Sequence, residues 1–212
     1  RRVHGGAVSV DSRPVEAGWE DKAAVHAGAK GRIAERAAAC IGEGETIYLD
    51  AGSTVLELAH RLAGRTDLTI VTNSLPVLVA LAGRGPRLIV LGGELRPMSR
   101  AIVGPLSRLV AEQLYVDRAF MGTFGLSLDA GLTTSDPAEA YTKELILGRA
   151  REVVLLADAA KLGTRSFAHA GRLDQVGLLI TDAPPDERAA SAFAEAGVRV
   201  IVAGAPAKGE LP

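Results

Sequence analysis

The stretch YLDAGSTVLELAH, residues 48–60, joins the pattern of a strand directly to that of a helix. A short apolar run ends at Asp50, the residues Gly52-Ser53-Thr54 follow, and apolar residues at helical spacing begin at Val55. Side chains at positions i, i+3 and i+4 lie on one face of a helix. The stretch therefore predicts a strand, a turn that carries an acid and two hydroxyls, and a helix that packs on a sheet.

The rest of the chain repeats this alternation. The expected strands are short runs rich in Val, Ile and Leu: Thr46–Asp50, Leu68–Thr72, Arg87–Leu91, Arg118–Gly122, Glu152–Asp158, Gly177–Thr181 and Val198–Val202. Several are apolar without alternation, which is typical of parallel strands that are buried on both faces. The expected helices are Lys30–Ile41, Ser53–Leu62, Leu75–Ala82, Pro105–Leu114, Pro137–Arg149 and Asp186–Ala196. Together these patterns predict an α/β fold, a Rossmann-like doubly wound and mostly parallel sheet.

Composition limits the class of protein. The chain has 212 residues, of which 48% are hydrophobic, and this is enough for one domain with a full core. A membrane-spanning helix needs about 20 apolar residues, no run approaches that length, and no cleavable signal stands at the start, so we expect a cytoplasmic protein without membrane contact. The 24 basic and 25 acidic residues give a formal net charge of -1, which is not typical of a nucleic-acid binder.

The sequence offers little support for metal or cofactor chemistry. Cys40 is the single cysteine, which excludes an internal disulfide and leaves no partner for a thiolate metal site. The four histidines are scattered and have no acid or cysteine at metal-ligand spacing: His4, His26, His60 and His169. The sequence contains no dinucleotide fingerprint and no Walker loop, and Ser53 lies in no nucleophile elbow. We therefore expect neither a metal nor a cofactor.

Polar and glycine residues gather at the carboxyl ends of the expected strands, where open parallel sheets bind ligands. These ends carry Asp50 with Gly52-Ser53-Thr54, Thr72-Asn73-Ser74, Gly92-Gly93-Glu94, and Asp158 with Lys161. The first N–H groups of a helix have no intrahelical partner and attract phosphate. Taken singly, such motifs also occur as ordinary helix caps and turns. Their convergence at one edge of the sheet favours a site for a small anionic ligand.

In this order and at these spacings, the motifs resemble the effector-binding domain of the DeoR family of bacterial sugar-metabolism repressors. The resemblance is carried by Asp50-Ala51-Gly52-Ser53-Thr54, Val71-Thr72-Asn73-Ser74, Leu91-Gly92-Gly93-Glu94 and Ala157-Asp158-Ala159-Ala160-Lys161. In addition, Arg1-Arg2-Val3-His4-Gly5-Gly6-Ala7 is similar to the junction at which the winged helix-turn-helix of that family ends. The resemblance spans nearly the whole chain, from Arg1 to about Val202.

The resemblance implies a domain organisation. It implies an N-terminal winged helix-turn-helix that this chain lacks, so operator DNA is expected to bind only through that missing part. Residues 1–20 are expected to be the end of the wing and a linker, and residues 21–212 the sensor domain. The resemblance also implies the fold of ribose-5-phosphate isomerase, glucosamine-6-phosphate deaminase and the CoA transferases. A homo-oligomer, dimer or tetramer, is expected because repressors bind paired half-sites.

The expected effector is a phosphorylated sugar or sugar alcohol. Its phosphate is expected at Gly52-Ser53-Thr54, with Asn73 and Ser74 as further contacts and Lys161 as a charge. Asp50 and Asp158 would accept hydrogen bonds from hydroxyls, and Lys143 could close over the ligand or face solvent. The segment 125–135 is a candidate lid or an ordinary surface loop. The complete set of expected effector-binding residues is Asp50, Gly52, Ser53, Thr54, Asn73, Ser74, Gly92, Gly93, Glu94, Lys143, Asp158 and Lys161.

The main alternative is an isomerase-like enzyme acting on a sugar phosphate. Isomerisation needs a base beside the substrate carbon, normally a carboxylate. Where the isomerase family has an acidic cluster, this chain has the segment Arg118–Thr123, which contains no acid. Glu94, Asp136 and Glu139 remain as candidate bases, but the sensor is the favoured reading. A plain oligomerisation module is a third alternative, which would leave the polar strand ends without a purpose.

Overall fold

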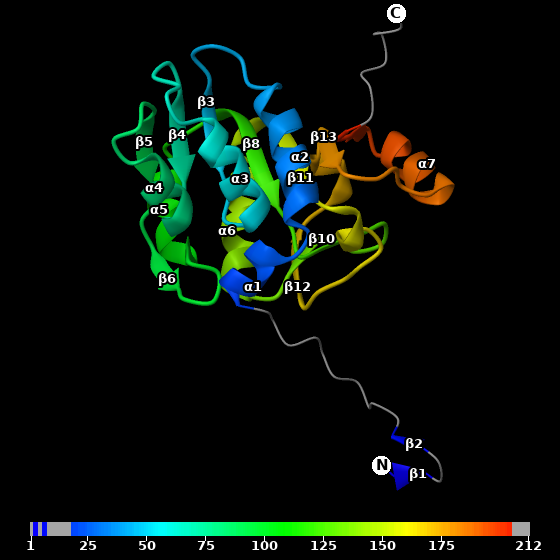
Figure 1. Cartoon of the computed structure of the whole chain (residues 1–212). Helices are drawn as coiled ribbons and strands as arrows, with labels where there is room; N and C mark the ends of the chain where they lie inside the picture. The colour runs from blue at the N-terminus through cyan, green and yellow to red at the C-terminus, as the bar shows by residue number, and fades with distance from the viewer. Residues whose placement is uncertain (1, 4–5, 8–17, 205–212) are drawn as a thin grey trace, which may run out of the picture.

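A seven-stranded parallel sheet forms the centre of the computed structural model, which describes residues 2–3, 6–7 and 18–204 (Figure 1). The order of its strands is β14-β13-β11-β8-β3-β4-β5. They are β3 (Thr46–Leu49), β4 (Thr69–Thr72), β5 (Arg87–Val90), β8 (Val116–Gly122), β11 (Ala150–Leu156), β13 (Leu178–Thr181) and β14 (Arg199–Val202). All seven strands that the sequence predicts are present, with ends that differ by at most two residues. The prediction of a doubly wound parallel sheet is confirmed.

Both faces of the sheet are covered, because alternate side chains of a strand point to opposite sides. In β3, Ile47 and Leu49 pack into one core and Tyr48 packs into the other. The helices are α1 (Trp19–Ala24), α2 (Ala27–Ala38), α3 (Ser53–Arg61), α4 (Leu75–Leu81), α5 (Arg108–Ala111), α6 (Pro137–Leu147) and α7 (Glu187–Glu195), with single turns η1 (Pro105–Ser107), η2 (Ala159–Lys161) and η3 (Leu173–Gln175). Helices α2, α3 and α4 contribute to the first core, and α5, α6 and α7 to the second. No helix in the described part of the chain is long and apolar enough to cross a membrane.

Several short antiparallel strands lie outside the central sheet. Strands β6 (Glu94–Arg96) and β7 (Ala101–Val103) form a hairpin, and β9 (Gly125–Ser127), β10 (Gly131–Thr134) and β12 (Ala168–Gly171) form a three-stranded sheet. The segment 125–135, expected as a lid or a surface loop, is therefore mostly a β-hairpin. Leu126 and Leu132 anchor this hairpin in the core, and β12 pairs with β10 along its other edge. The expectation of a loop is corrected on this point.

The N-terminal part is described only in places. Strands β1 (Arg2–Val3) and β2 (Gly6–Ala7) pair with each other, and most of the expected wing and linker, residues 8–17 included, lies outside the described residues. The expected domain boundary at residue 20 lies within α1, which packs against α3.

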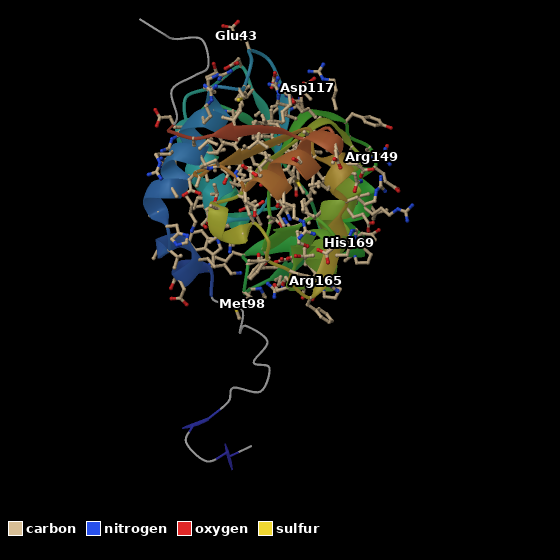
Figure 2. All side chains as sticks on the ribbon, turned by 90° about the vertical axis from the view of Figure 1, so that its right-hand side faces the viewer. Glu43, Met98, Asp117, Arg149, Arg165 and His169 are labelled. Atoms are coloured by element: carbon tan, nitrogen blue, oxygen red, sulfur yellow. The ribbon has the colours of Figure 1, made fainter. Side chains whose placement is uncertain are left out.

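The chain order creates a switch point in the sheet. From β3, the next strands β4 and β5 are added on one side, whereas β8, β11, β13 and β14 are added on the other. Crevices for ligands form at such points, beyond the carboxyl ends of the strands. Figure 2 shows the two ends of the sheet, with Glu43 and Asp117 at the amino end and Met98 at the opposite end. The sequence thereby places Asp50, which follows β3, at the position where a ligand is expected.

Candidate functional site

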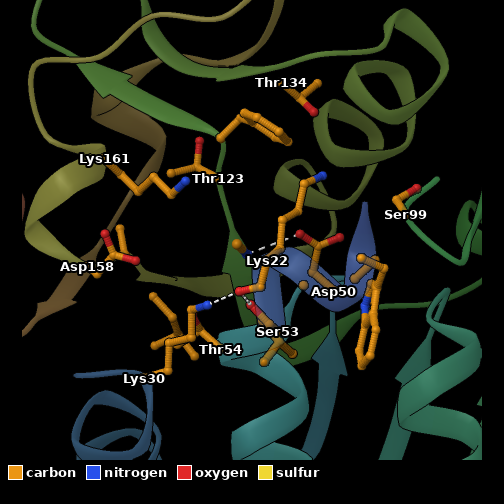
Figure 3. Close-up of a pocket in the computed structure, with 18 of the residues that line it drawn as sticks. Lys22, Lys30, Asp50, Ser53, Thr54, Ser99, Thr123, Thr134, Asp158 and Lys161 are labelled. Atoms are coloured by element: carbon orange, nitrogen blue, oxygen red, sulfur yellow. Dashed lines mark hydrogen bonds between the residues drawn. The ribbon is translucent and has the colours of Figure 1, made fainter. Parts of the chain in front are cut away.

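A cavity of ≈ 410 Å³ lies at the switch point (Figure 3). Its walls come from α1, α2, the start of α3, the ends of β4, β8 and β11, the β6–β7 turn, α6 and η2. Eight of the expected effector-binding residues line it: Asp50, Gly52, Ser53, Thr54, Asn73, Lys143, Asp158 and Lys161. The fold thus brings most of the polar residues singled out in the sequence into one cavity.

Four expected residues do not line the cavity. Ser74 is buried and caps α4, because its hydroxyl accepts a hydrogen bond from the N–H of Val77 at 3.3 Å. Gly92, Gly93 and Glu94 are exposed after β5, the edge strand of the sheet. Since β5 is two strands away from β3, its carboxyl end lies to the side of the switch point. The rule on strand ends therefore selects the right edge of the sheet and the ends of β3, β4 and β11, but it wrongly includes the end of β5.

A buried ion pair lies in the cavity wall. Lys143 donates to the Asp50 carboxylate and, at 2.9 Å, to the carbonyl of Gly122, and the N–H of Gly122 donates to Asp50 Oδ2 at 3.1 Å. Asp50 is 1% exposed and Lys143 is 7% exposed. Burial raises the pKa of Asp50, and the Lys143 ammonium opposes this shift. Of the two alternatives expected for Lys143, a solvent-facing side chain is wrong, because Lys143 is buried in the cavity wall and bound to Asp50.

The turn at the start of α3 has the geometry of an anion site. Gly52 precedes the helix with φ 151°, a conformation that L side chains rarely adopt, and no side chain caps the helix start. Ser53 and Thr54 begin the helix, and both line the cavity. The hydroxyl of Ser53 donates to the backbone carbonyl of Lys22, 3.3 Å away in α1. The partial positive charge of the helix start is thus directed into a cavity that α1 covers.

Cationic side chains line the same end of the cavity. Lys30 is 5% exposed and donates to the backbone carbonyls of Lys22 and Val25. Burial lowers the pKa of Lys30 below its usual value of 10.5, while the charge of Asp158 opposes this shift. His26 Nδ1 lies 3.7 Å from Asp158 Oδ1.

Two further lysines, Lys22 and Lys161, lie close to the Phe124 ring. Lys22 Nζ lies 4.2 Å and Lys161 Nζ 5.3 Å from the centre of the Phe124 ring. In Figure 3, Lys161, Asp158 and Lys30 lie together on one side of Asp50, and Ser99 lies on the other. The cavity therefore has a cationic end, where Lys30 and Lys161 lie beside Asp158.

Away from the cationic end, the cavity wall has hydrogen-bonding atoms that lack a partner among the described residues. Asn73 Nδ2 donates to the carbonyl of Ile102 at 3.1 Å, while Asn73 Oδ1 and Ser99 Oγ have no partner. Asn73 is 3% exposed and Ser99 is 9% exposed. Unpartnered buried polar atoms are rare, and each costs about 1–3 kcal/mol.

Sequence reasoning missed a large part of the lining. Glu139 was selected only as a candidate base, and the lining residues that were not selected for any role are Trp19, Asp21, Lys22, Val25, His26, Lys30, Ala51, Val55, Ser99, Ala101, Gly122, Thr123, Phe124, Thr134, Leu156, Ala157 and Ala160. One signal was available, because Lys30 shares a helix face with Ile33, Ala34 and Ala37, and a lysine at such a position needs a partner.

The candidate bases of the enzyme alternative are engaged elsewhere. Asp136 caps α6 and pairs with Arg96 at 3.2 Å. Glu139 lines the cavity, but its two oxygens bind Thr134 at 2.7 Å and Arg96 at 3.1 Å. Glu94 is exposed outside the cavity. No cluster of three or more His, Cys, Asp or Glu side chains suited to a metal occurs within the described residues.

Comparison with known proteins identifies related regulators. The profile of the DeoR C-terminal sensor domain matches residues 25–183. The HTH-type transcriptional regulator GlpR of Haloferax volcanii is 36% identical over 200 residues, which cover 94% of this chain and 78% of that protein. The glycerol-3-phosphate regulon repressor of Escherichia coli is 35% identical over 185 residues, which cover 87% of this chain and 73% of that protein. The resemblance seen in the sequence is confirmed, and so is the prediction of a regulator in preference to an enzyme.

Two solved structures show partial likeness. Ribose 5-phosphate isomerase A from Methanocaldococcus jannaschii is 19% identical with a TM-score of 0.47, over 63% of this chain and 53% of that chain. The eIF2B beta protein from Chaetomium thermophilum is 15% identical with a TM-score of 0.51, over 80% of this chain and 53% of that chain. At this identity the second likeness concerns the fold alone.

Proposed function

The chain belongs to the DeoR family of transcriptional regulators, and from this premise we propose that its cavity binds a phosphorylated sugar or sugar alcohol as effector. The observation that carries the proposal is the meeting of the α3 start with Lys30 and Lys161 in one cavity. In this proposal the effector controls DNA binding by a helix-turn-helix domain, the module that the name of the Haloferax volcanii relative includes.

The phosphate belongs at the cationic end. The first N–H groups of α3 and the hydroxyls of Ser53 and Thr54 would donate to its oxygens, and Lys161 would supply charge. The name of the Escherichia coli relative contains a phosphorylated polyol, which supports this class of ligand. Asn73 is better suited to a hydroxyl than to the phosphate, because its unpartnered atom, Oδ1, is an acceptor and a phosphate oxygen cannot donate to it.

The sugar hydroxyls belong toward the acceptors of the cavity. Since the carbonyl of Ile102 can only accept, the amide of Asn73 is fixed with its nitrogen toward it, and Oδ1 is left as an acceptor. Ser99 can donate or accept, and the carboxylate of Asp158, which lies beside Lys161 and Lys30, is a further acceptor. A sugar hydroxyl can donate a hydrogen bond to these acceptors, whereas the oxygens of a second phosphate would be repelled by them.

Regulation further requires that the effector bind two states of the repressor with different affinity. We propose that the functional unit is a homo-oligomer, because operators with paired half-sites match a protein of two-fold symmetry.

Thermal-shift measurements test the proposal. Triose, pentose, hexose and polyol phosphates are each compared with the unphosphorylated compound. A phosphate at about 100 times its Kd should stabilise the fold by about 2.7 kcal/mol, which corresponds to about 5 to 10 °C for a domain of this size. The free sugars should give much smaller shifts, because they leave the helix start empty.

Two variants locate the phosphate. Lys161→Ala and Thr54→Val each remove a donor, and each should weaken phosphate binding about ten- to a hundredfold, since a hydrogen bond to a charged group contributes about 1.5–3 kcal/mol. Arg165→Ala is the matched control, because Arg165 is an exposed cation that does not line the cavity (Figure 2). Equal shifts by sugars and their phosphates, or wild-type responses in both variants, would disprove the phosphate site.

A further inference from the structure

Helix α1 covers the cavity without being anchored in the core. It has six residues, and none of its described side chains is buried: Trp19 and Lys22 are half-buried, and Glu20, Asp21 and Ala24 are exposed. Apolar burial is the main source of stability for a short helix, and α1 has little of it. What holds α1 in place must therefore be mostly polar contacts.

Three of these contacts come from two side chains of the proposed phosphate site. The hydroxyl of Ser53 and the ammonium of Lys30 both donate to the backbone carbonyl of Lys22, and Lys30 also donates to that of Val25 (Figure 3). Both acceptors are backbone oxygens in or directly after α1. The groups that fasten α1 are thus donors at the cationic end of the cavity.

Further contacts lie at the far end of α1. Arg100 pairs with Glu20 at 2.7 Å, and its guanidinium lies 4.9 Å from the centre of the Trp19 ring. The Arg100–Glu20 pair is largely exposed to solvent, and exposed ion pairs are weak. The chain can also bend beside α1, because His26, between α1 and α2, has φ 54°.

We propose that α1 is a lid that the effector releases, because a phosphate at the start of α3 takes the hydrogen bonds of Ser53 and Lys30 that now hold α1. The inference rests on the proposed phosphate site. A phosphate oxygen is a stronger acceptor than a backbone carbonyl because it is charged. Once both donors turn to the phosphate, α1 loses these hydrogen bonds to the cavity wall, whereas its contacts with Arg100 and that of Lys22 with Phe124 stay in place. The expected end of the wing and linker, residues 1–20, leads directly into α1 and includes its first two residues.

Trp19 reports the state of the lid, since it is the single tryptophan of the chain and lies in α1. The probes are inorganic phosphate and glycerol 3-phosphate, with binding measured by calorimetry. On saturation, acrylamide should quench Trp19 more strongly, and the amide hydrogens of residues 22–25 should exchange faster. Binding without either change, or with greater protection of α1, would overturn the lid while leaving the phosphate site intact. If neither probe binds, the phosphate site and the lid both fail.

Arg100→Gln adds a test that a purely structural role would not pass. If the effector must release α1, weakening its other attachment raises the fraction of open protein and therefore tightens phosphate binding, by up to about fivefold for an exposed pair. Simple electrostatics makes the opposite prediction, because the variant removes a positive charge. The matched variant Glu20→Gln breaks the same pair from the other side and should also tighten binding. Weaker binding of phosphate by Arg100→Gln would overturn the proposal.

Discussion

Replacing Lys143 with methionine tests whether the ion pair in the cavity wall is needed for the fold. The substitution fills the space of the lysine stem but leaves the Asp50 carboxylate, which is 1% exposed, without its ammonium partner. Burial then raises the pKa of Asp50 with no charge from Lys143 to oppose it. The folded variant is expected to bind a proton at Asp50, because burying a lone charge costs more.

The expected loss of stability follows from the cost of that proton. An unfolded aspartate has a pKa of about 3.9, and each pH unit above it costs about 1.4 kcal/mol if the folded state must stay protonated. The penalty is about 4 kcal/mol at about pH 7 and about 1.5 kcal/mol at about pH 5. The first value agrees with the loss of about 3–5 kcal/mol when one partner of a buried pair is removed. Since the folded variant binds one proton more than the unfolded chain, its stability falls as the pH rises through this range.

Urea denaturation of wild type and Lys143→Met at about pH 5 and about pH 7 measures both the loss and its slope. The double variant Asp50→Asn/Lys143→Met is the control, and it should recover most of the stability because it buries no charge. A loss below about 1 kcal/mol at about pH 7, or a loss that does not change with pH, would refute this reasoning.

Lys30→Arg should flatten the pH dependence of phosphate binding. The wild type should lose affinity for phosphate as the pH rises through the pKa of Lys30, which is lowered below 10.5. The variant should keep its affinity, because arginine stays charged. Calorimetry in alkaline buffers checks this, and parallel curves would contradict it. Gly131→Ala should destabilise the fold more than Gly44→Ala in urea denaturation; φ is 63° and 68°, but only at Gly131 would a Cβ lie 2.3 Å from the carbonyl oxygen of Gly171. Equal losses would show that backbone strain alone sets the cost. Light scattering should give a mass above the 22.0 kDa of one chain, and a monomer at tens of micromolar would count against the oligomer.

The sequence predicts the central sheet well because its strands are buried on both faces. Such strands must be apolar at nearly every position, as in Leu178–Thr181, so they stand out from the helices between them. The short antiparallel strands have no such signature. Gly131–Thr134 is buried along its whole length, but it contains one large apolar residue, Leu132, and two threonines, and its pairing with distant Ala168–Gly171 leaves no local pattern.

The sequence predicts only those residues of the site that follow the central strands. Residues that directly follow the central strands, such as Asp50 and Asp158, could be placed from the topology alone. Residues that reach the cavity from other layers could not, because their position depends on how α1 and α2 pack over the sheet. Lys22 and Ser99 have no feature in their local sequence that links them to Asp50.

Three lysines of the cavity carry the same charge but should behave differently when replaced, because their partners differ. Lys143 is bound to a buried carboxylate, so replacing it should lower the free energy of unfolding. Lys30 is bound to neutral carbonyls of the α1 region, so a ligand can compete for it without leaving a buried charge alone. Lys161 is half-buried against the Phe124 ring, a weaker partner that it can exchange for a phosphate. Substitution of these residues therefore separates the stability of the fold, the position of the lid and the affinity for the effector.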